Sequence, residues 1–216
     1  MHVVIFEGSQ WHTFAPLSLS RPVFALASGA GTLLEKQVRH LRPSRLTLWV
    51  RPALADYCRR ELAPQLKVPV AINQPLDDET ALIVSGRTLH FSRFVHSEDQ
   101  GVIVEEGANL VRKAIVRMPG LSYDDVMNRT DKWLKLLNLP RMEDQARMPD
   151  YIWDLIDWNE ESLVADFVAM HERPSEKPAG PYHMVHEENI WIAPQVKLEP
   201  GAVLDASRGP VMLDVG

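Results

Sequence analysis

The residues best suited to chemistry lie near the start of the chain, where polar and basic side chains follow a short apolar run. Residues 2–6 (HVVIF) predict a buried strand, and a long polar segment leads from it to the small-residue turn 28–31 (SGAG). Thr32 and Glu35 have the T-x-x-E spacing of a capping box, so a helix is expected to begin there. A strand, a polar loop and a capped helix are the parts from which α/β folds build phosphate sites. We therefore expect an anion site within residues 14–36.

Lys36 falls in the first turn of this expected helix. The positive end of the helix dipole disfavours a cation there, which hints at an external anion near the lysine. A solvated lysine is an equally good interpretation of the same position.

Three other candidates have structural interpretations. Cys58 lies in a helical pattern and is expected to be a buried apolar residue, and no second cysteine exists to form an intrachain disulfide. His183 and His186 have an H-x-x-H spacing but no nearby third ligand, so we do not expect a metal site there. Asn159 precedes a stripe-bearing helix, and we expect it to cap that helix.

The elements that must position these residues alternate between strand and helix. Strands are expected at Arg45–Val50, Val68–Ile72 and Ala81–Val84 and around 102–104 and 114–116, and helices at about 32–41, from Pro52 to before Pro64, at Ser122–Leu137 and after Asn159. This alternation predicts an α/β fold whose mixed, mostly parallel sheet has helices on both faces.

Ligands bind beyond the carboxyl ends of the strands in such a sheet. The segment after Phe6 and the Ser85-Gly86-Arg87 turn both leave strands at those ends. We therefore expect these two segments to face one another across a ligand crevice.

The last part of the chain has a different pattern. Residues 172–181 are rich in proline and predict a linker between a domain at 1–171 and a second element at 182–216. Ile192, Leu198 and Leu204 recur every six residues, as in a hexapeptide parallel β-helix. Since such repeats need about three stacked neighbours, we expect the chain to be a fragment whose β-helix continues.

Composition excludes several classes of partner. The net charge of −6 argues against a nucleic acid polymer or an anionic membrane as a partner, because both attract basic surfaces. No apolar run approaches the roughly 20 residues that span a bilayer, and the N-terminus lacks a basic leader. We expect a cytoplasmic location.

Several strings, in order, are similar to one protein family. They are P-L-S-x-S-R-P at 16–22, G-x-x-T-L-x-E-K at 29–36, LIVSGR at 82–87, YIWDLIDWN at 151–159 and HEENIWIAP at 186–194 with the tail LEPGAVLDASRGPV. Together they resemble the sugar nucleotidyltransferases, in particular the branch similar to bifunctional N-acetylglucosamine-1-phosphate uridyltransferase and glucosamine-1-phosphate acetyltransferase.

The resemblance implies a fold, a reaction and partners. The fold would be a Rossmann-like nucleotidyltransferase domain followed by the first turns of a left-handed parallel β-helix of the acyltransferase type. The reaction would join a nucleoside triphosphate and a sugar 1-phosphate into a nucleotide-sugar, such as UDP-N-acetylglucosamine, with release of pyrophosphate. Mg²⁺ would be the cofactor, and the β-helix would assemble a homotrimer.

The resemblance also implies roles for individual residues. Arg21, at the basic position before proline, and Lys36 would be catalytic through contact with phosphate oxygens, as a guanidinium can clamp a phosphate in bidentate fashion. Asp154, with Asp157 as the competing assignment, would be a metal ligand. The expected nucleotide and phosphate contacts are Pro16, Leu17, Ser18, Ser20, Gly86 and Arg87.

Two departures from the family pattern support a second hypothesis. Arg87 stands where relatives carry a metal-binding aspartate after glycine, and the opening segment has His12 and Ala27 where relatives often have arginines. The first hypothesis is an enzyme. The alternative is a catalytically degenerate module that keeps the fold and serves binding, regulation or assembly.

Overall fold

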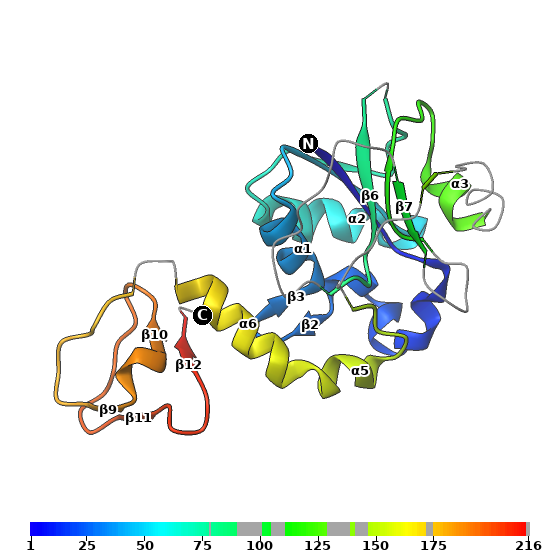
Figure 1. Cartoon of the computed structure of the whole chain (residues 1–216). Coiled ribbons are helices and arrows are strands. Elements are labelled where there is room, and N and C mark those ends of the chain that lie inside the picture. Colours follow the sequence, from blue (N-terminus) through cyan, green and yellow to red (C-terminus); the bar gives the residue numbers. More distant parts are fainter. Residues whose placement is uncertain are drawn as a thin grey trace. The chain divides into compact units, whose positions relative to one another are not determined.

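The computed structural model of the protein describes residues 1–77, 79–89, 101–104, 111–128, 139–140, 147–171 and 175–214. They form two compact units (Figure 1). The first comprises Met1–Ala27 and Thr32–Ile156, and the second Ser28–Gly31 and Asp157–Gly216.

A six-stranded sheet in the order β5-β4-β1-β6-β8-β7 forms the centre of the first unit. Strand β1 pairs in parallel with β4 and β6, β4 pairs in parallel with β5, and β8 is antiparallel to β6 and β7. The predicted mixed, mostly parallel sheet is therefore confirmed, and β5 lies at one of its edges. The strands are β1 (His2–Phe6), β4 (Arg45–Trp49), β5 (Val70–Ile72), β6 (Ala81–Ser85), β7 (Gly101–Val104) and β8 (Val111–Val116).

The strand order reverses between β1 and β6. From β1 the chain moves to β4 and β5 on one side, whereas β6, β8 and β7 lie on the other. Phe6 and Ser85 are register partners at the carboxyl ends, and the Gly86 N–H donates to the Phe6 carbonyl at 2.7 Å. The segments after these two strands therefore lie side by side, and the expected ligand crevice between them stays a prediction.

Helices cover both faces of the sheet (Figure 1), and a buried apolar cluster lies on each face. On one face, helices α1 (Leu33–Leu41) and α2 (Ala55–Tyr57) pack on buried residues of β1, β4 and β6. On the other face, α3 (Tyr123–Asn128) packs through Val126 on a cluster that includes Val4 and Ile83. All of β1 is buried, with Val3 and Ile5 in one cluster and Val4 and Phe6 in the other, as expected for a strand covered on both faces.

The predicted helices are present with different bounds. Thr32 caps α1 with the complete capping box, as expected. The helix predicted from Pro52 is a continuous helical stretch in which α2 is flanked by 3₁₀ and π turns up to Gln65. Of the helix predicted at Ser122–Leu137, only α3 falls within the described residues. A further short helix, α5 (Ile152–Asp157), is also present.

The opening segment consists of short turns and a hairpin. Three 3₁₀ turns, at Ser9–Phe14, Leu17–Leu19 and Val23–Ala25, lead from β1 to the strands β2 (Ala27–Ser28) and β3 (Gly31–Thr32). Phe14 and Phe24 are fully buried and hold the segment on the domain. The predicted turn at 28–31 is the tip of this hairpin.

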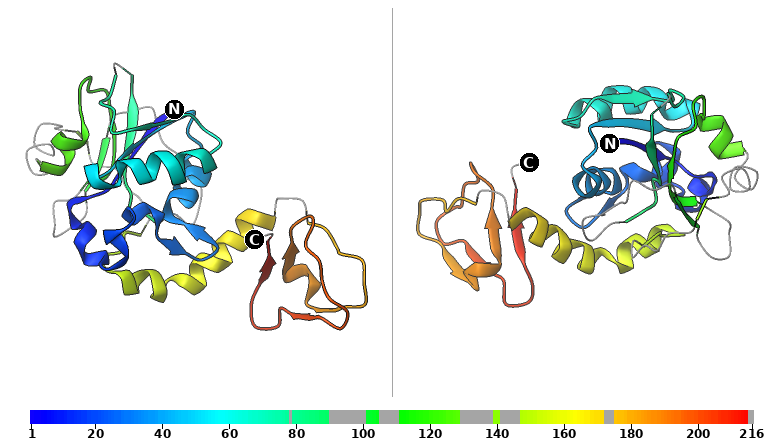
Figure 2. Two further views of the ribbon diagram at one scale, coloured as in Figure 1. Left: turned by 180° about the vertical axis from the view of Figure 1, so that it is seen from behind. Right: turned by 45° about the horizontal axis from the view of Figure 1, so that its top comes forward.

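The second unit contains α6 (Asn159–His171) and a coil of short strands, drawn in orange and red in Figure 2. The strands are β9 (His183–Val185), β10 (Ile190–Ile192), β11 (Val203–Asp205) and β12 (Val211–Leu213). Strand β9 pairs in parallel with β11, and β10 with β12. The period-six residues Ile192, Leu198 and Leu204 share one apolar cluster inside the coil.

Helix α6 packs through Phe167 and Met170 on Trp191 of the coil, so it belongs to the same unit as residues 182–214.

No helix within the described ranges combines the length and the apolar character needed to cross a lipid bilayer.

Candidate functional site

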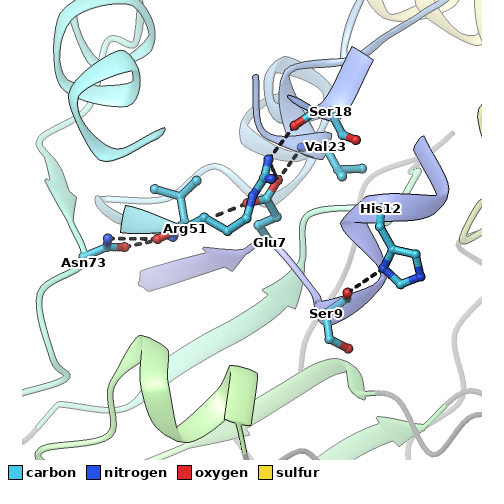
Figure 3. A network of polar contacts seen from close by, with 8 residues as sticks. Glu7, Ser9, His12, Ser18, Val23, Arg51 and Asn73 are labelled. Carbon is cyan, nitrogen blue, oxygen red and sulfur yellow. Dashed lines mark hydrogen bonds and ion pairs between the residues drawn. The ribbon is translucent and has the colours of Figure 1, made fainter. Parts of the chain in front are cut away.

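Two oppositely charged residues leave neighbouring strands at the carboxyl edge of the sheet (Figure 3). Glu7 follows β1, and Arg51 follows β4 by two positions. The Arg51 Nε lies 2.9 Å from Glu7 Oε2, and Arg51 Nη2 lies 3.3 Å from Glu7 Oε1. The side chain of Glu7 is 0% exposed and that of Arg51 16% exposed. This is a bidentate ion pair that is largely withdrawn from water.

The pair also fixes the opening segment. The Arg51 guanidinium donates to the carbonyl of Ser18, and the Val23 N–H donates to Glu7 Oε1 at 3.2 Å. The same guanidinium lies over the ring of Trp11, with its Cζ 3.7 Å from the ring centroid. Burial raises the pKa of Glu7, and the hydrogen bonds and charge of Arg51 oppose that rise.

Arg51 projects from a fixed backbone. Its own N–H points to Glu7 Oε2 at 3.4 Å, and the preceding residue, Val50, is held by Asn73. The Asn73 amide accepts the Val50 N–H at 2.8 Å and donates to the Val50 carbonyl at 2.9 Å (Figure 3). These two hydrogen bonds fix the backbone at the end of β4, directly before Arg51.

Gln37, a glutamine on α1, fixes the turn after β6 through two hydrogen bonds. The Gln37 side-chain NH₂ donates to the carbonyls of Ser85, at 3.1 Å, and Thr88, at 2.7 Å, and Gln37 is fully buried. Gly86 has no room for a side chain, since a Cβ there would lie 2.8 Å from Phe24 Cδ1. The predicted Gly86 site residue is therefore explained by close packing against the opening segment.

Arg87 points into the protein, where it is 2% exposed. Its Nη1 donates to the Pro149 carbonyl at 2.7 Å and lies 3.1 Å from Asp150 Oδ1. Thr13, from the opening segment, donates to the carbonyl of the same Asp150. The predicted phosphate contact of Arg87 does not fit this burial, and we assign the side chain to joining the β6 turn to residues 149–150.

Arg21, the predicted catalytic arginine, lies at the surface. It is exposed, and no hydrogen bond or ion pair ties it to another described residue. The positions before it in the opening segment are mostly exposed as well, namely Pro16, Leu17, Leu19 and Ser20. Ser18 differs, because its side chain is fully buried and its hydroxyl has no hydrogen-bond partner among the described residues.

Lys36 is 1% exposed. The interpretation of Lys36 as a solvated lysine is therefore wrong. A buried ammonium at the start of α1 requires partners, and Lys36 has contacts of this kind. Its predicted role with phosphate stays a prediction.

Asp154, the predicted metal ligand, has a structural task. Its Oδ2 accepts the N–H groups of Asp150, at 2.8 Å, and Tyr151, at 2.9 Å, and so caps the first turn of α5. Over the part of the chain that the structure describes, no three His, Cys, Asp or Glu side chains gather as metal ligands. Since Mg²⁺ is commonly held by one or two carboxylates together with substrate phosphates, the metal role of Asp154 stays a prediction.

The hairpin tip uses its backbone donors within the second unit. The Gly29 N–H donates to Asn159 Oδ1 at 2.7 Å, and the Ala30 N–H donates to Asp166 Oδ2 at 2.8 Å. Side chains of α6 thus already accept from these two N–H groups. The expectation that residues 28–31 belong to the anion site is therefore wrong. Asn159 is the first residue of α6 and holds the hairpin, so the capping role expected for it is also wrong.

Sequence reasoning missed three residues of the site: Glu7, Gln37 and Arg51. A signal for the first and third was available, because each is a charge that directly follows a strand-like apolar run. Gln37 is a polar residue on the apolar face of α1, four positions after Leu33 and four before Leu41.

The fold and this edge of the sheet define a Rossmann-like nucleotidyltransferase domain. The inositol-1-phosphate CTP transferase from T. maritima has a similar fold, with a TM-score of 0.51 and 12% sequence identity over 79% of this chain and 96% of that chain. The CTP:phosphocholine cytidylyltransferase from Streptococcus pneumoniae has a TM-score of 0.44 and 11% identity, over 74% of this chain and 98% of that chain.

A family model described as sugar nucleotidyl transferase matches residues 3–174, which is most of the chain. The protein belongs to the sugar nucleotidyl transferase family. No curated protein matches the sequence.

Proposed function

We propose that the protein is a sugar-1-phosphate nucleotidyltransferase whose site lies at the carboxyl ends of β1 and β6. A phosphate oxygen of the sugar 1-phosphate attacks the α-phosphorus of a nucleoside triphosphate. The bond from that phosphorus to the bridging oxygen of the β-phosphate breaks, and pyrophosphate leaves. Family membership supports the reaction class, and the switch in strand order supports the place.

The exposure of Arg21 is the observation that carries the proposal. Arg21 is an exposed cation in a segment that Glu7 and Arg51 hold beside the end of β1. Transfer of a nucleotidyl group depends mainly on positioning and on neutralising phosphate charge, which a fixed guanidinium supplies. We assign Arg21 to the triphosphate oxygens, with the Pro16–Ser20 backbone as its neighbour in the site.

The identity of the substrates rests on sequence resemblance. We propose UTP and N-acetylglucosamine 1-phosphate, giving UDP-N-acetylglucosamine. Residues 182–214 would then be the first coil of a hexapeptide β-helix of the acyltransferase type, through which the full protein forms a homotrimer. The parallel pairing of β9 with β11 and of β10 with β12, and the shared cluster of period-six residues, support that part.

Mg²⁺ would neutralise the triphosphate in this reaction. Asp154 Oδ2 accepts two backbone N–H groups, and no cluster of three His, Cys, Asp or Glu side chains occurs among the described residues. We therefore derive no step from the metal and propose only that Mg²⁺ arrives with the nucleotide.

The second candidate is a non-catalytic module that uses the same fold for assembly. Arg87 favours it, because this arginine replaces the expected carboxylate and is engaged by Asp150 and Pro149. In this case the protein would bind a nucleotide or none, without turnover.

A pyrophosphate-release assay separates the two candidates. The protein is incubated with Mg²⁺, UTP or dTTP, and a panel of hexose 1-phosphates. Turnover that is lost in Arg21→Ala and kept in Arg208→Ala, an exposed arginine of the coil, supports the enzyme. Nucleotide binding without release of pyrophosphate under any condition supports the module.

A further inference from the structure

The exposed Arg21 sits in a short bridge that is tied at both ends. The Ser18 carbonyl accepts from the Arg51 guanidinium, and the Val23 N–H donates to Glu7 Oε1 at 3.2 Å. Leu19–Pro22 span the gap between these two contacts. Both ends of the bridge therefore depend on one ion pair.

The guanidinium of Arg51 makes three kinds of contact at once. It forms the bidentate pair with Glu7, it donates to Ser18, and it covers one face of the Trp11 ring at 3.7 Å. A lysine could not reproduce this set, because its ammonium is a single point charge without a planar fork or a stacking face. The contacts reach both the first 3₁₀ turn of the opening segment and its second.

The base of this arrangement is rigid. Glu7 extends β1, which pairs on both sides, and the backbone before Arg51 is locked by Asn73. The ion pair therefore anchors the opening segment, which has little regular structure of its own, to the sheet.

We propose that Arg51 is a positioning residue that acts through Arg21, by holding Leu19–Pro22 where Arg21 meets the phosphates of the nucleotide. This inference rests on the proposed function. Without the tether the bridge samples other conformations, so only a fraction of molecules is ready to bind. The apparent affinity for nucleotide falls by that fraction, while turnover of the bound complex is kept.

The test compares Arg51→Lys with the wild type in steady-state kinetics. We expect KM for the nucleoside triphosphate to rise roughly tenfold with kcat within about twofold, as for a loss of pre-organisation. Arg59→Lys, on an exposed arginine that pairs with Asp56, is the matched control and should leave both constants unchanged. A fall in kcat with unchanged KM would overturn the proposal.

The double variant decides whether the effect passes through Arg21. If it does, Arg51→Lys adds little to Arg21→Ala, and the combined loss in kcat/KM is well below the product of the single losses. Losses that multiply would mean that Arg51 acts independently, and the proposal fails. Trp11→Leu keeps the ion pair and removes the stacked ring, so a smaller rise in KM is expected from it.

Hydrogen exchange of the ligand-free protein gives a readout that needs no activity. Faster exchange within residues 8–22 in Arg51→Lys, with the exchange of β1 and β4 unchanged, supports the tether. Equal exchange in variant and wild type would overturn it. If the wild type releases no pyrophosphate, the proposed function fails, and this comparison alone decides whether Arg51 orders the segment.

Discussion

Glu7 and Arg51 form a bidentate ion pair across the carboxyl ends of two adjacent parallel strands, with Nε–Oε2 at 2.9 Å. The Glu7 side chain of this pair is completely buried, with 0% of its surface exposed. Removing one partner should therefore cost more than it would in a surface pair such as Arg59–Asp56.

Breaking one half of this pair should destabilise the domain strongly. Arg51→Met leaves the Glu7 carboxylate buried without its partner, and we expect the free energy of unfolding to fall by about 3–5 kcal/mol. Glu7→Gln combined with Arg51→Met removes both charges and should cost clearly less than the sum of the two single changes. Urea unfolding of the four proteins measures the cycle, and strict additivity would contradict a direct ion pair.

The hairpin tip should not tolerate a side chain at Gly29. A Cβ there would lie 2.5 Å from Asp166 Oδ2 and 2.8 Å from Ser162 Oγ, and the backbone has φ +68°. Gly201→Ala is the matched control in the same unit, since Gly201 has φ +84° and nothing within 4 Å. Both variants carry backbone strain of about 1–2 kcal/mol, and Gly29→Ala should be more destabilised by the clash. Equal losses in thermal unfolding would contradict the packing of the tip on α6.

Acidification should weaken the protein through His2. Burial lowers the pKa of His2 from its ordinary value of 6.5, and the nearby charge of Arg45 lowers it further. The unfolded chain therefore binds a proton at a pH at which folded His2 stays neutral, so the free energy of unfolding declines as the pH falls from 6.5 to the folded pKa. Unfolding measured across this window should be less pH-dependent in His2→Gln, and an unchanged slope would contradict the assignment.

Arg87 should behave as a structural residue. Arg87 is buried and donates to the Pro149 carbonyl, whereas its partner Asp150 is 59% exposed, so Arg87→Met is expected to cost about 1–3 kcal/mol in stability. The affinity of the remaining folded protein for nucleotide should be little changed. If Arg87→Met lost nucleotide binding at unchanged stability, the structural role would be contradicted and a phosphate contact of Arg87 would be supported.

Much of the fold follows from local patterns in the sequence. The apolar runs at 2–6 and 81–84 predict parallel strands, and the Thr32–Glu35 spacing predicts the start of α1, which the capping box confirms. The rule that ligands bind beyond the carboxyl ends of the strands predicts that the segments after Phe6 and Ser85 lie near one another, as they do. The strands and the helix start depend on residues close together in the chain.

The contacts that the sequence did not reveal join distant residues. Asn159 and Asp166 accept from the N–H groups of Gly29 and Ala30 across 130 and 136 positions, and Arg87 donates to Asp150 across 63 positions. Nothing in the local sequence shows that a backbone donor already has a partner. For this reason the sequence predicts an anion site that includes residues 28–31 and Arg87, although their polar groups bind other parts of the protein. Arg21, by contrast, is exposed, as a phosphate contact requires.

Titration calorimetry with nucleoside triphosphate tests the central claim most directly, because it asks whether Arg21 binds phosphate. UTP and dTTP are titrated with Mg²⁺ into the wild type, Arg21→Ala and Arg208→Ala. A charge-assisted hydrogen bond contributes about 1.5–3 kcal/mol, so Arg21→Ala should bind roughly 10- to 100-fold more weakly while Arg208→Ala matches the wild type. Equal affinities of wild type and Arg21→Ala, or no binding by the wild type, would contradict the claim.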